Sequence, residues 1–239
     1  MARFINEQQP DILCIQEVFK PKQAETLFLD DQFNFLSELK RVGAFEHEYF
    51  APAYGLSIAG KSLEEGQAIL SKFPISNQAA PHTYQHYFNR DEIGEKLHNT
   101  RIIQHCLVSF PDGKQMTLGN YQGYLDGPKG IGTEVTIETM QKVRDELKDL
   151  PRPMIFCGDF NVWPSSPALK ELDDLKLRNL TIENGVKSTL SDMHRAPAED
   201  RAIACCDYIL VSDEVVVKSF SVSEEIVSDH KALILKFTL

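Results

Sequence analysis

The chain has 239 residues, of which 42% are apolar and 25% are charged, so a largely disordered protein is excluded and one large core is expected. The 35 acidic and 25 basic residues give a formal net charge of -10, which opposes sequence-independent attraction to nucleic-acid phosphates. Binding of a phosphate ligand would therefore need local positive charge, which divalent cations held by carboxylates can supply.

Two further features of the sequence concern the cellular location of the protein and its number of domains. No run approaches the ~20 consecutive apolar residues of a bilayer-spanning helix, and residues 1–10 have neither the basic nor the apolar region of a signal peptide. We therefore expect a cytoplasmic protein with no membrane partner. No linker rich in proline, glycine or serine divides the chain, so we expect one domain over residues 1–239, and a monomer.

Short apolar runs alternate with a few amphipathic stretches. In chain order, the predicted elements are the end of a helix (2–9), a strand (11–17), a helix (22–40), strands at 49–58 and 67–71, a loop or helical excursion (81–100), strands at 101–110 and 114–121, a helix (134–150), and strands at 154–157, 207–211, 215–222 and 231–238. This alternation predicts a layered α/β fold with sheets packed face to face and helices outside.

Polar groups follow apolar runs at four places, where functional side chains often lie. They are QE at 16–17, GDFN at 158–161, DY at 207–208 and SDH at 228–230. Each alone has a structural explanation, such as a solvated strand end, an Asx turn, a cap or a hydrogen-bonded core histidine. Their joint occurrence points instead to one shared site.

The residue types suit metal-assisted phosphate chemistry. Glu17, Asp159 and Asp229 offer the hard oxygen donors that Mg²⁺ or Mn²⁺ prefers, and the sequence has no cysteine and histidine set with zinc spacing. His230 beside Asp207 could form an imidazole oriented by a carboxylate, which would complete a phosphoryl-transfer site.

The order DILCIQE, GQAILSKFPI, GDFN, CDYILVS and SDH resembles the endonuclease/exonuclease/phosphatase superfamily, from about Ile5 to Leu239. The resemblance implies a four-layered α/β sandwich, with two mixed β-sheets packed face to face and helices outside. It also implies magnesium-dependent cleavage of a phosphate ester.

The resemblance also assigns roles to matching positions. It implies that Asp159 positions or deprotonates the attacking water, that Asn161 contacts phosphate and metal, and that His230 holds the scissile phosphate. Asp207 would orient His230. The metal, Mg²⁺ or Mn²⁺, would be bound by two further carboxylates, those of Glu17 and Asp229.

Four positions are candidates for substrate binding besides Asn161: Asn120, Gln122, Arg101 and Lys129. Many relatives have the pattern N-x-H where this chain has Asn120-Tyr121-Gln122. A glutamine has no titratable proton to give a leaving group, although it can hydrogen-bond a phosphate oxygen. We expect the loss of one catalytic contribution, of roughly 10²-fold.

The start of the chain departs from the family pattern. Relatives normally open with a strand of the form TxNI that lies within a sheet and supplies a metal-contacting amide, whereas residues 2–9 already belong to the helix that follows it. Its loss should leave unpaired backbone groups, each costing ~1–3 kcal/mol if buried. Either the protein begins upstream, or another segment fills the gap, or the chain is a degraded copy.

These observations predict a metal-dependent hydrolase of phosphate esters, whether phosphodiesterase, nuclease or phosphatase, acting on nucleic acid or on a phosphorylated small molecule. The alternative is a catalytically impaired family fold that acts as a binding module. Retention of all six principal site residues argues against that alternative, and the missing amide together with Gln122 argues for it.

Overall fold

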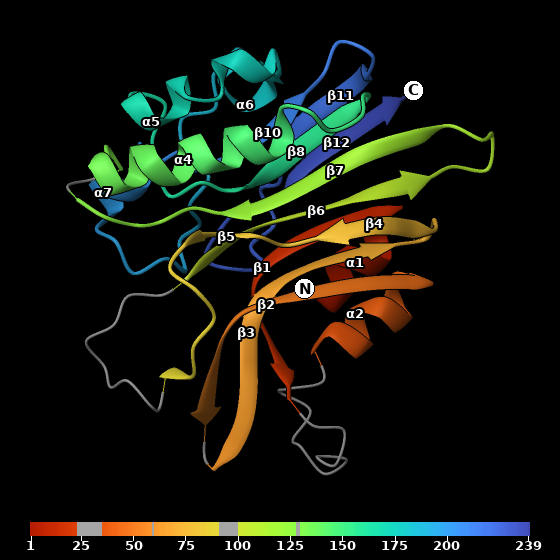
Figure 1. The fold of residues 1–239 in the computed structure, drawn as a ribbon, viewed down its shortest axis with the longest axis horizontal. Coiled ribbons are helices and arrows are strands. Elements are labelled where there is room, and N and C mark those ends of the chain that lie inside the picture. Colours follow the sequence, from red (N-terminus) through yellow and green to blue (C-terminus); the bar gives the residue numbers. More distant parts are fainter. Residues whose placement is uncertain (23–34, 59, 91–99, 128–129) are drawn as a thin grey trace.

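A computed structural model describes residues 1–22, 35–58, 60–90, 100–127 and 130–239. Figure 1 shows the arrangement of its helices and strands. In chain order they are α1 (Ala2–Gln8), β1 (Ile12–Pro21), α2 (Phe35–Val42), β2 (His47–Ile58), β3 (Lys61–Ser71), β4 (Ile75–Ala79), β5 (His82–Tyr84), β6 (Arg101–Ser109), β7 (Gln115–Gln122), α4 (Glu134–Leu147), β8 (Met154–Asp159), α5 (Pro167–Lys170), the 3-10 helix η2 (Asp173–Leu175), β9 (Arg178–Asn179), α6 (Leu180–Glu183), α7 (Ala198–Arg201), β10 (Asp207–Val211), β11 (Val216–Val222) and β12 (Leu233–Thr238).

The described strands form three sheets. The largest has the order β4-β6-β7-β8-β10-β9, with β5 also paired to β6. Its one parallel pair is β7–β8, which α4 connects. The other sheets, β1-β3-β2 and β11-β12, are antiparallel throughout.

Buried side chains divide these elements into four layers. One apolar cluster lies between the largest sheet and the two smaller ones, with members such as Ile69 from β3 and Ile155 from β8. A second cluster lies between the other face of the largest sheet and α4, where Met140 and Phe156 are fully buried. A third lies between α1, α2 and the sheet of β1. The predicted fold class, an α/β sandwich with helices outside, is confirmed.

Local sequence signals account for the helix that covers the largest sheet. Thr133 begins α4 with a capping box, because its side chain accepts from the third helical residue while Thr136 accepts from the backbone N–H of Thr133 at 3.0 Å. The buried residues of α4 recur at helical spacing, and Pro151 follows soon after the helix ends. The predicted helix over 134–150 is therefore confirmed, although it ends at Leu147.

Two other predicted elements differ from the structure. The strand predicted to end at Glu17 continues to Pro21, because the pairing of β1 with β3 shifts register between Ile15 and Val18 and accommodates Glu17 as a bulge. The helix predicted over 22–40 is described only from Phe35, as α2, and it continues to Val42. Residues 23–34 of that prediction lie outside the described residues.

The second layer of strands consists of two separate sheets within the described residues. Among the described residues, β1 has β3 as its one strand partner and β12 has β11. A sheet that was expected to be continuous therefore consists of two parts, β1-β3-β2 and β11-β12, each with an open edge.

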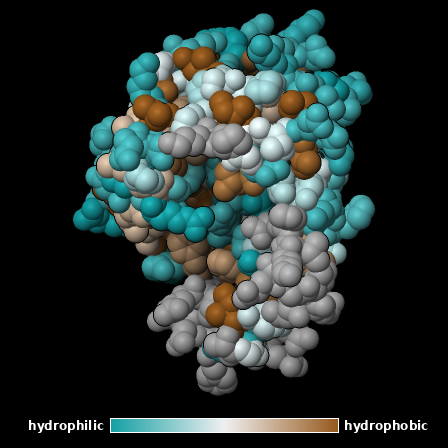
Figure 2. All heavy atoms as spheres, turned by 90° about the vertical axis from the view of Figure 1, so that its left-hand side faces the viewer, coloured by the Kyte–Doolittle hydropathy of each residue, from teal (hydrophilic) through white to brown (hydrophobic). Residues whose placement is uncertain are grey.

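The surface mixes polar and apolar side chains. On the face shown in Figure 2, apolar residues form scattered groups among hydrophilic ones over the upper part of the molecule. Such scattering is ordinary for a folded protein. No helix within the described residues has both the length and the apolar character needed to cross a bilayer.

Candidate functional site

The predicted site residues gather where β7, β8 and β10 meet the loop that precedes β12. A cavity of about 710 Å³ reaches this place. Six of the predicted residues line it: Glu17, Gln122, Asp159, Asp207, Asp229 and His230. Glu17 and His230, 213 positions apart, thus share one cavity, as the sequence hypothesis requires.

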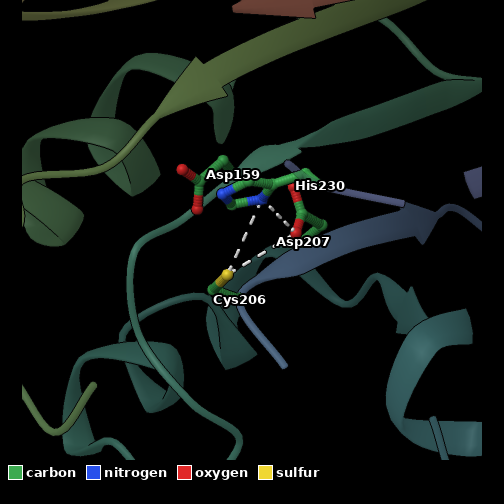
Figure 3. Close-up of side chains that lie close together, drawn as sticks. All are labelled: Asp159, Cys206, Asp207 and His230. Atoms are coloured by element: carbon green, nitrogen blue, oxygen red, sulfur yellow. Dashed lines mark hydrogen bonds and ion pairs between the residues drawn. The ribbon is translucent and has the colours of Figure 1, made fainter. Parts of the chain in front are cut away.

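Asp207 and His230 form the best-defined pair. Asp207 is the first residue of β10, and its Oδ2 lies 2.8 Å from Nδ1 of His230. The backbone places His230 through a bridge to Leu190, and the His230 N–H donates to Ser228 Oγ at 3.3 Å. Figure 3 shows the imidazole directed toward Asp159 and Asp207. Asp207 is therefore placed to orient the histidine ring.

The surroundings keep His230 protonated. Burial acts to lower the pKa of the imidazole, but the hydrogen bond and charge of Asp207, with the charges of Asp159 and Asp229, raise it to about 10. The ring therefore carries a positive charge at neutral pH. With Nδ1 engaged by Asp207, the Nε2–H can donate to an anionic oxygen.

The sequence GDFN makes a sharp turn at the end of β8. Gly158 is required there because a Cβ would lie 1.9 Å from the backbone oxygen of Tyr121 on the neighbouring strand. Asn161 has a φ of 55°, a left-handed conformation that asparagine tolerates better than most residues. Its backbone N–H donates to Asp159 Oδ1 at 2.9 Å, and its Nδ2 donates to the Gly123 oxygen at 3.0 Å. The turn thereby fixes the Asp159 carboxylate.

Buried aromatic rings pack against one another beneath this turn. Phe160 is fully buried, with its ring centroid 4.8 Å from that of Phe156 and 5.1 Å from that of Tyr208. The Tyr208 hydroxyl donates to the Val162 oxygen at 2.8 Å. Asp159 is thus attached directly to the rigid core, which limits the motion of its carboxylate.

The surroundings of Asp159 disfavour the ionised form of its carboxyl group. Burial and the neighbouring carboxylate of Asp207, with a contribution from Glu17, raise the pKa of Asp159 to about 7, although His230 acts to lower it. Asp159 and Asp207 are directly opposite each other on paired strands. A carboxylate that ionises near neutral pH is suited to take a proton from water.

The bulge in β1 brings Glu17 to the same place. Glu17 has a φ of 55°, and Gln122 Nε2 donates to its Oε1 at 2.6 Å. Gln122 is the last residue of β7 and pairs with Asp159 of β8 in the parallel ladder. The hydrogen bond therefore joins the two strand layers at the end of the cavity where Asp159 lies.

The donor set fits a divalent cation. Asp159, Cys206, Asp207 and His230 place one potential ligand atom each within 4.8 Å of one another, and a second group unites His194, Asp229 and His230. Burial, followed by the charge of Asp207, raises the pKa of Asp159, and a cation bound nearby would favour its ionised form. Carboxylate oxygens are the donors that Mg²⁺ and Mn²⁺ prefer.

Comparison with known proteins identifies the family. A model described as the Endonuclease/Exonuclease/phosphatase family matches residues 1–230. The chain belongs to this family. Its description names enzymes that cleave phosphate esters. No curated protein matches the sequence significantly.

Solved structures agree with the family fold. The chain aligns over its full length with endonuclease/exonuclease/phosphatase proteins of Beutenbergia cavernae (TM-score 0.70, 19% identity) and Bacteroides vulgatus (TM-score 0.70, 21% identity). It covers 65% of the former, slightly less than two thirds, and 88% of the latter. A mannosyl-6-phosphatase of Bacteroides thetaiotaomicron aligns with TM-score 0.66, 18% identity, and coverage of 100% of this chain and 89% of that one.

Among the described residues, three predicted positions are not part of the cavity lining: Asn161, Asn120 and Arg101. Asn120 is fully buried, and its side chain accepts from Gln16 Nε2 at 2.6 Å while donating to Gln104 Oε1 and to backbone oxygens. Arg101 is 6% exposed, and its guanidinium donates to the oxygens of Gly123 and Thr100 at 2.7 and 3.0 Å. The hydrogen bonds of Asn120 and Arg101 thus stabilise the backbone around the site. Lys129 lies outside the described residues.

Sequence reasoning missed some neighbours of the site. Cys206 Sγ donates to Asp207 Oδ2 at 3.5 Å, and Ser228 Oγ donates to Asp229 Oδ1 at 3.0 Å. The His194 ring centroid lies 5.8 Å from that of His230. Cys206 and Ser228 belong to the CDYILVS and SDH motifs, but the sequence assigned them no role. His194 is 36 positions from His230, and no local pattern links the two.

Proposed function

We propose that this protein is a divalent-metal-dependent phosphoester hydrolase, using Mg²⁺ or Mn²⁺. The observation that carries the proposal is the grouping of Asp159, Asp207 and His230, whose ligand atoms lie within 4.8 Å of one another beside the 710 Å³ cavity. A general base (Asp159), a positively charged imidazolium (His230) and the carboxylate that orients this imidazolium (Asp207) thus lie within reach of one phosphate.

The proposed division of labour follows from charge. The imidazolium of His230 donates from Nε2 to a non-bridging phosphate oxygen, while Asp207 holds Nδ1 and keeps the ring oriented. Asp159 accepts a proton from the attacking water as a new P–O bond forms and the bond to the leaving group breaks. Both groups act on charge that develops in the transition state.

The remaining residues bind and orient. Glu17 and Asp229 are the proposed metal ligands, and a bound cation would neutralise charge on the phosphate as a Lewis acid. Asn161 fixes Asp159 through its backbone N–H and is the proposed contact to substrate. Gln122 orients Glu17 and has no proton to give the leaving group.

The substrate is proposed only by class. The mannosyl-6-phosphatase among the similar structures supports a phosphorylated small molecule as substrate, and the net charge of -10 makes a nucleic-acid duplex the less favoured choice. We further propose that the protein acts in the cytoplasm as a monomer, in one domain.

The test is an assay with p-nitrophenyl phosphate and bis-p-nitrophenyl phosphate, with added Mg²⁺ or Mn²⁺ and with a chelator. The variants Asp159→Asn and His230→Gln should each lose roughly 10²-fold to 10⁴-fold of kcat. Asp174→Asn and His86→Gln, at exposed positions, are the matched controls and should retain wild-type turnover.

Two results would contradict the proposal. Equal turnover by the wild type and both site variants would exclude this site as the source of activity. If no ester is hydrolysed with either metal, the alternative of a binding module is favoured.

A further inference from the structure

A buried thiol lies beside the residues that are proposed to act on phosphate. Cys206 directly precedes β10, and it is only 7% exposed. Figure 3 shows its sulfur directed toward the imidazole of His230 and the carboxylate of Asp207. The proposed division of labour gives this thiol no part in hydrolysis, and Mg²⁺ does not require it.

Hydrogen bonds hold Cys206 against this pair. Its Sγ lies 3.5 Å from Asp207 Oδ2 and 4.0 Å from His230 Nδ1, and these two atoms are themselves 2.8 Å apart. The fully buried Thr189 accepts at Oγ1 from the backbone N–H groups of Cys206 and Asp207, at 3.1 and 3.2 Å. The sulfur is therefore held in place by the fold and not by a chance rotamer of an exposed side chain.

Asp159 completes a set of four donors. The set, called here the Cys206 cluster, consists of Asp159, Cys206, Asp207 and His230, and one ligand atom of each lies within 4.8 Å of the others. In a tetrahedral zinc site with bonds of ~2.0–2.3 Å, neighbouring donor atoms are ~3.3–3.7 Å apart. The separations of 2.8, 3.5 and 4.0 Å lie on both sides of this range, so small side-chain shifts bring the donors into coordination.

The chemistry of the donors selects a different ion from the one that hydrolysis is proposed to use. Thiolate sulfur and imidazole nitrogen favour Zn²⁺ and other thiophilic cations, whereas Mg²⁺ and Mn²⁺ favour oxygen. Glu17 and Asp229, the proposed ligands of Mg²⁺ or Mn²⁺, are not members of the Cys206 cluster. The cluster members Asp159, Asp207 and His230 line the 710 Å³ cavity, which gives an ion a path to the buried sulfur.

Coordination changes the protonation of two members. Burial, with the nearby charges of Asp207 and Asp159, raises the pKa of the Cys206 thiol, so the metal-free side chain is neutral. When a thiophilic cation binds, the S–H proton of Cys206 and the Nδ1–H proton of His230 leave to solvent as the two metal–ligand bonds form. No oxidant or other reactant is needed.

We propose that the Cys206 cluster is a binding site for Zn²⁺, separate from the proposed Mg²⁺ or Mn²⁺ ligands, and that Zn²⁺ bound there inhibits hydrolysis. The bound ion occupies the Asp159 carboxylate that would take a proton from water, and it breaks the pairing of His230 with Asp207. The inhibition rests on the proposed function, whereas binding of Zn²⁺ does not.

Cadmium is a spectroscopic probe for this site, because a cadmium–thiolate bond gives an ultraviolet charge-transfer band. Titration of the wild type with Cd²⁺ in excess Mg²⁺ should give a band that saturates at one ion per chain. Cys206→Ala should lack the band and should bind Zn²⁺ roughly 10²-fold or more weakly by calorimetry, since one of four ligands is lost. Cys205→Ala is the matched control, because Cys205 is adjacent and equally buried but lies outside the cluster, and it should behave as the wild type does.

Inhibition is measured with p-nitrophenyl phosphate and excess Mg²⁺, relative to the activity of each variant without Zn²⁺. The concentration of Zn²⁺ that halves activity should be roughly tenfold or more higher for Cys206→Ala than for the wild type and Cys205→Ala. If no variant hydrolyses the ester, the proposed function fails, and the cadmium band and the calorimetry alone decide whether the site exists.

Three results would overturn the proposed site. Equal Zn²⁺ affinity of Cys206→Ala and the wild type would show that the thiol is not a ligand. Loss of the cadmium band in Cys157→Ala would assign the ion to Cys157 and Cys14, which both line the cavity. Loss of Zn²⁺ binding in His194→Gln, with binding by Cys206→Ala unchanged, would assign it to the group of His194 and Asp229. If Cys206→Ala does not fold, Cys206→Ser keeps a similar size and a hydrogen-bonding group but forms no thiolate band.

Discussion

Gln122 at the end of β7 donates a hydrogen bond to the carboxylate of Glu17 at 2.6 Å, although the two residues belong to different sheets. An amide in this position can orient a metal ligand but cannot titrate. The contact thus lets a glutamine at this position orient the Glu17 carboxylate, which we propose as a metal ligand.

Loss of this hydrogen bond should weaken metal binding more than turnover. Gln122→Leu frees the Glu17 carboxylate to rotate, and a change in a residue that orients a ligand typically lowers metal affinity by about 10-fold to 100-fold. Calorimetric titration with Mn²⁺ should show this decrease, while kcat at saturating metal changes less. Gln115→Leu, at the exposed start of β7, is the control and should bind Mn²⁺ normally.

Removal of the Asp207 charge should move the pH dependence. In Asp207→Asn the pKa of His230 should fall from about 10 toward its ordinary value of 6.5, because its main stabilising partner is gone. Activity of the variant should then decline above about pH 7, whereas the wild type keeps its imidazolium to about pH 10. Imidazole NMR titration measures the pKa directly, and an unchanged value would contradict the assigned pairing.

The pair of Asp207 and His230 should also make the free energy of unfolding depend on pH in a definite direction. The folded-state pKa of His230 is above its ordinary value, so its stabilising contribution is complete below pH 6.5 and is lost as the pH rises through 10. Urea unfolding at pH 6 and pH 10 should show a larger difference between the wild type and His230→Gln at the lower pH. A difference that grew with pH would be inconsistent with this sign.

Asp159 should make stability fall with rising pH in the same direction as His230, but in a lower pH window. Its folded-state pKa is raised from 3.8 to about 7, so ionisation of the carboxyl makes the metal-free protein less stable as the pH rises through that window. Asp159→Asn should abolish activity yet raise the Tm at pH 8 by a few °C, since 1 kcal/mol corresponds to roughly 2–4 °C at this size. Mn²⁺ should raise the Tm of the wild type more than that of the variant.

Arg101 offers a test that separates structure from substrate binding. Arg101→Met removes one donor from the Thr100 carbonyl and leaves the Gly123 carbonyl with Asn161 Nδ2, which should lower the free energy of unfolding by about 1–3 kcal/mol. The KM of the folded variant should change little. A raised KM with unchanged stability in urea would instead support the substrate contact predicted from the sequence.

The sequence predicted those features that depend on local pattern. The GDFN turn follows from an apolar run that ends at glycine, and its geometry needs only contacts within the turn and the adjacent strand. The bulge at Glu17 was not predicted, because periodicity cannot show that β1 resumes pairing after the interruption. The structural bonds of Arg101 could not be predicted for a related reason, since its acceptor Gly123 is 22 positions away and becomes a neighbour only in the folded sheet.

The direct opposition of Asp159 and Asp207 on neighbouring strands has a consequence for the evolution of this protein. Two like charges in such a position oppose each other most when no cation is present. A laboratory selection for heat resistance in chelating medium would therefore favour neutral residues at these two positions, and the survivors would keep the sandwich while losing its chemistry.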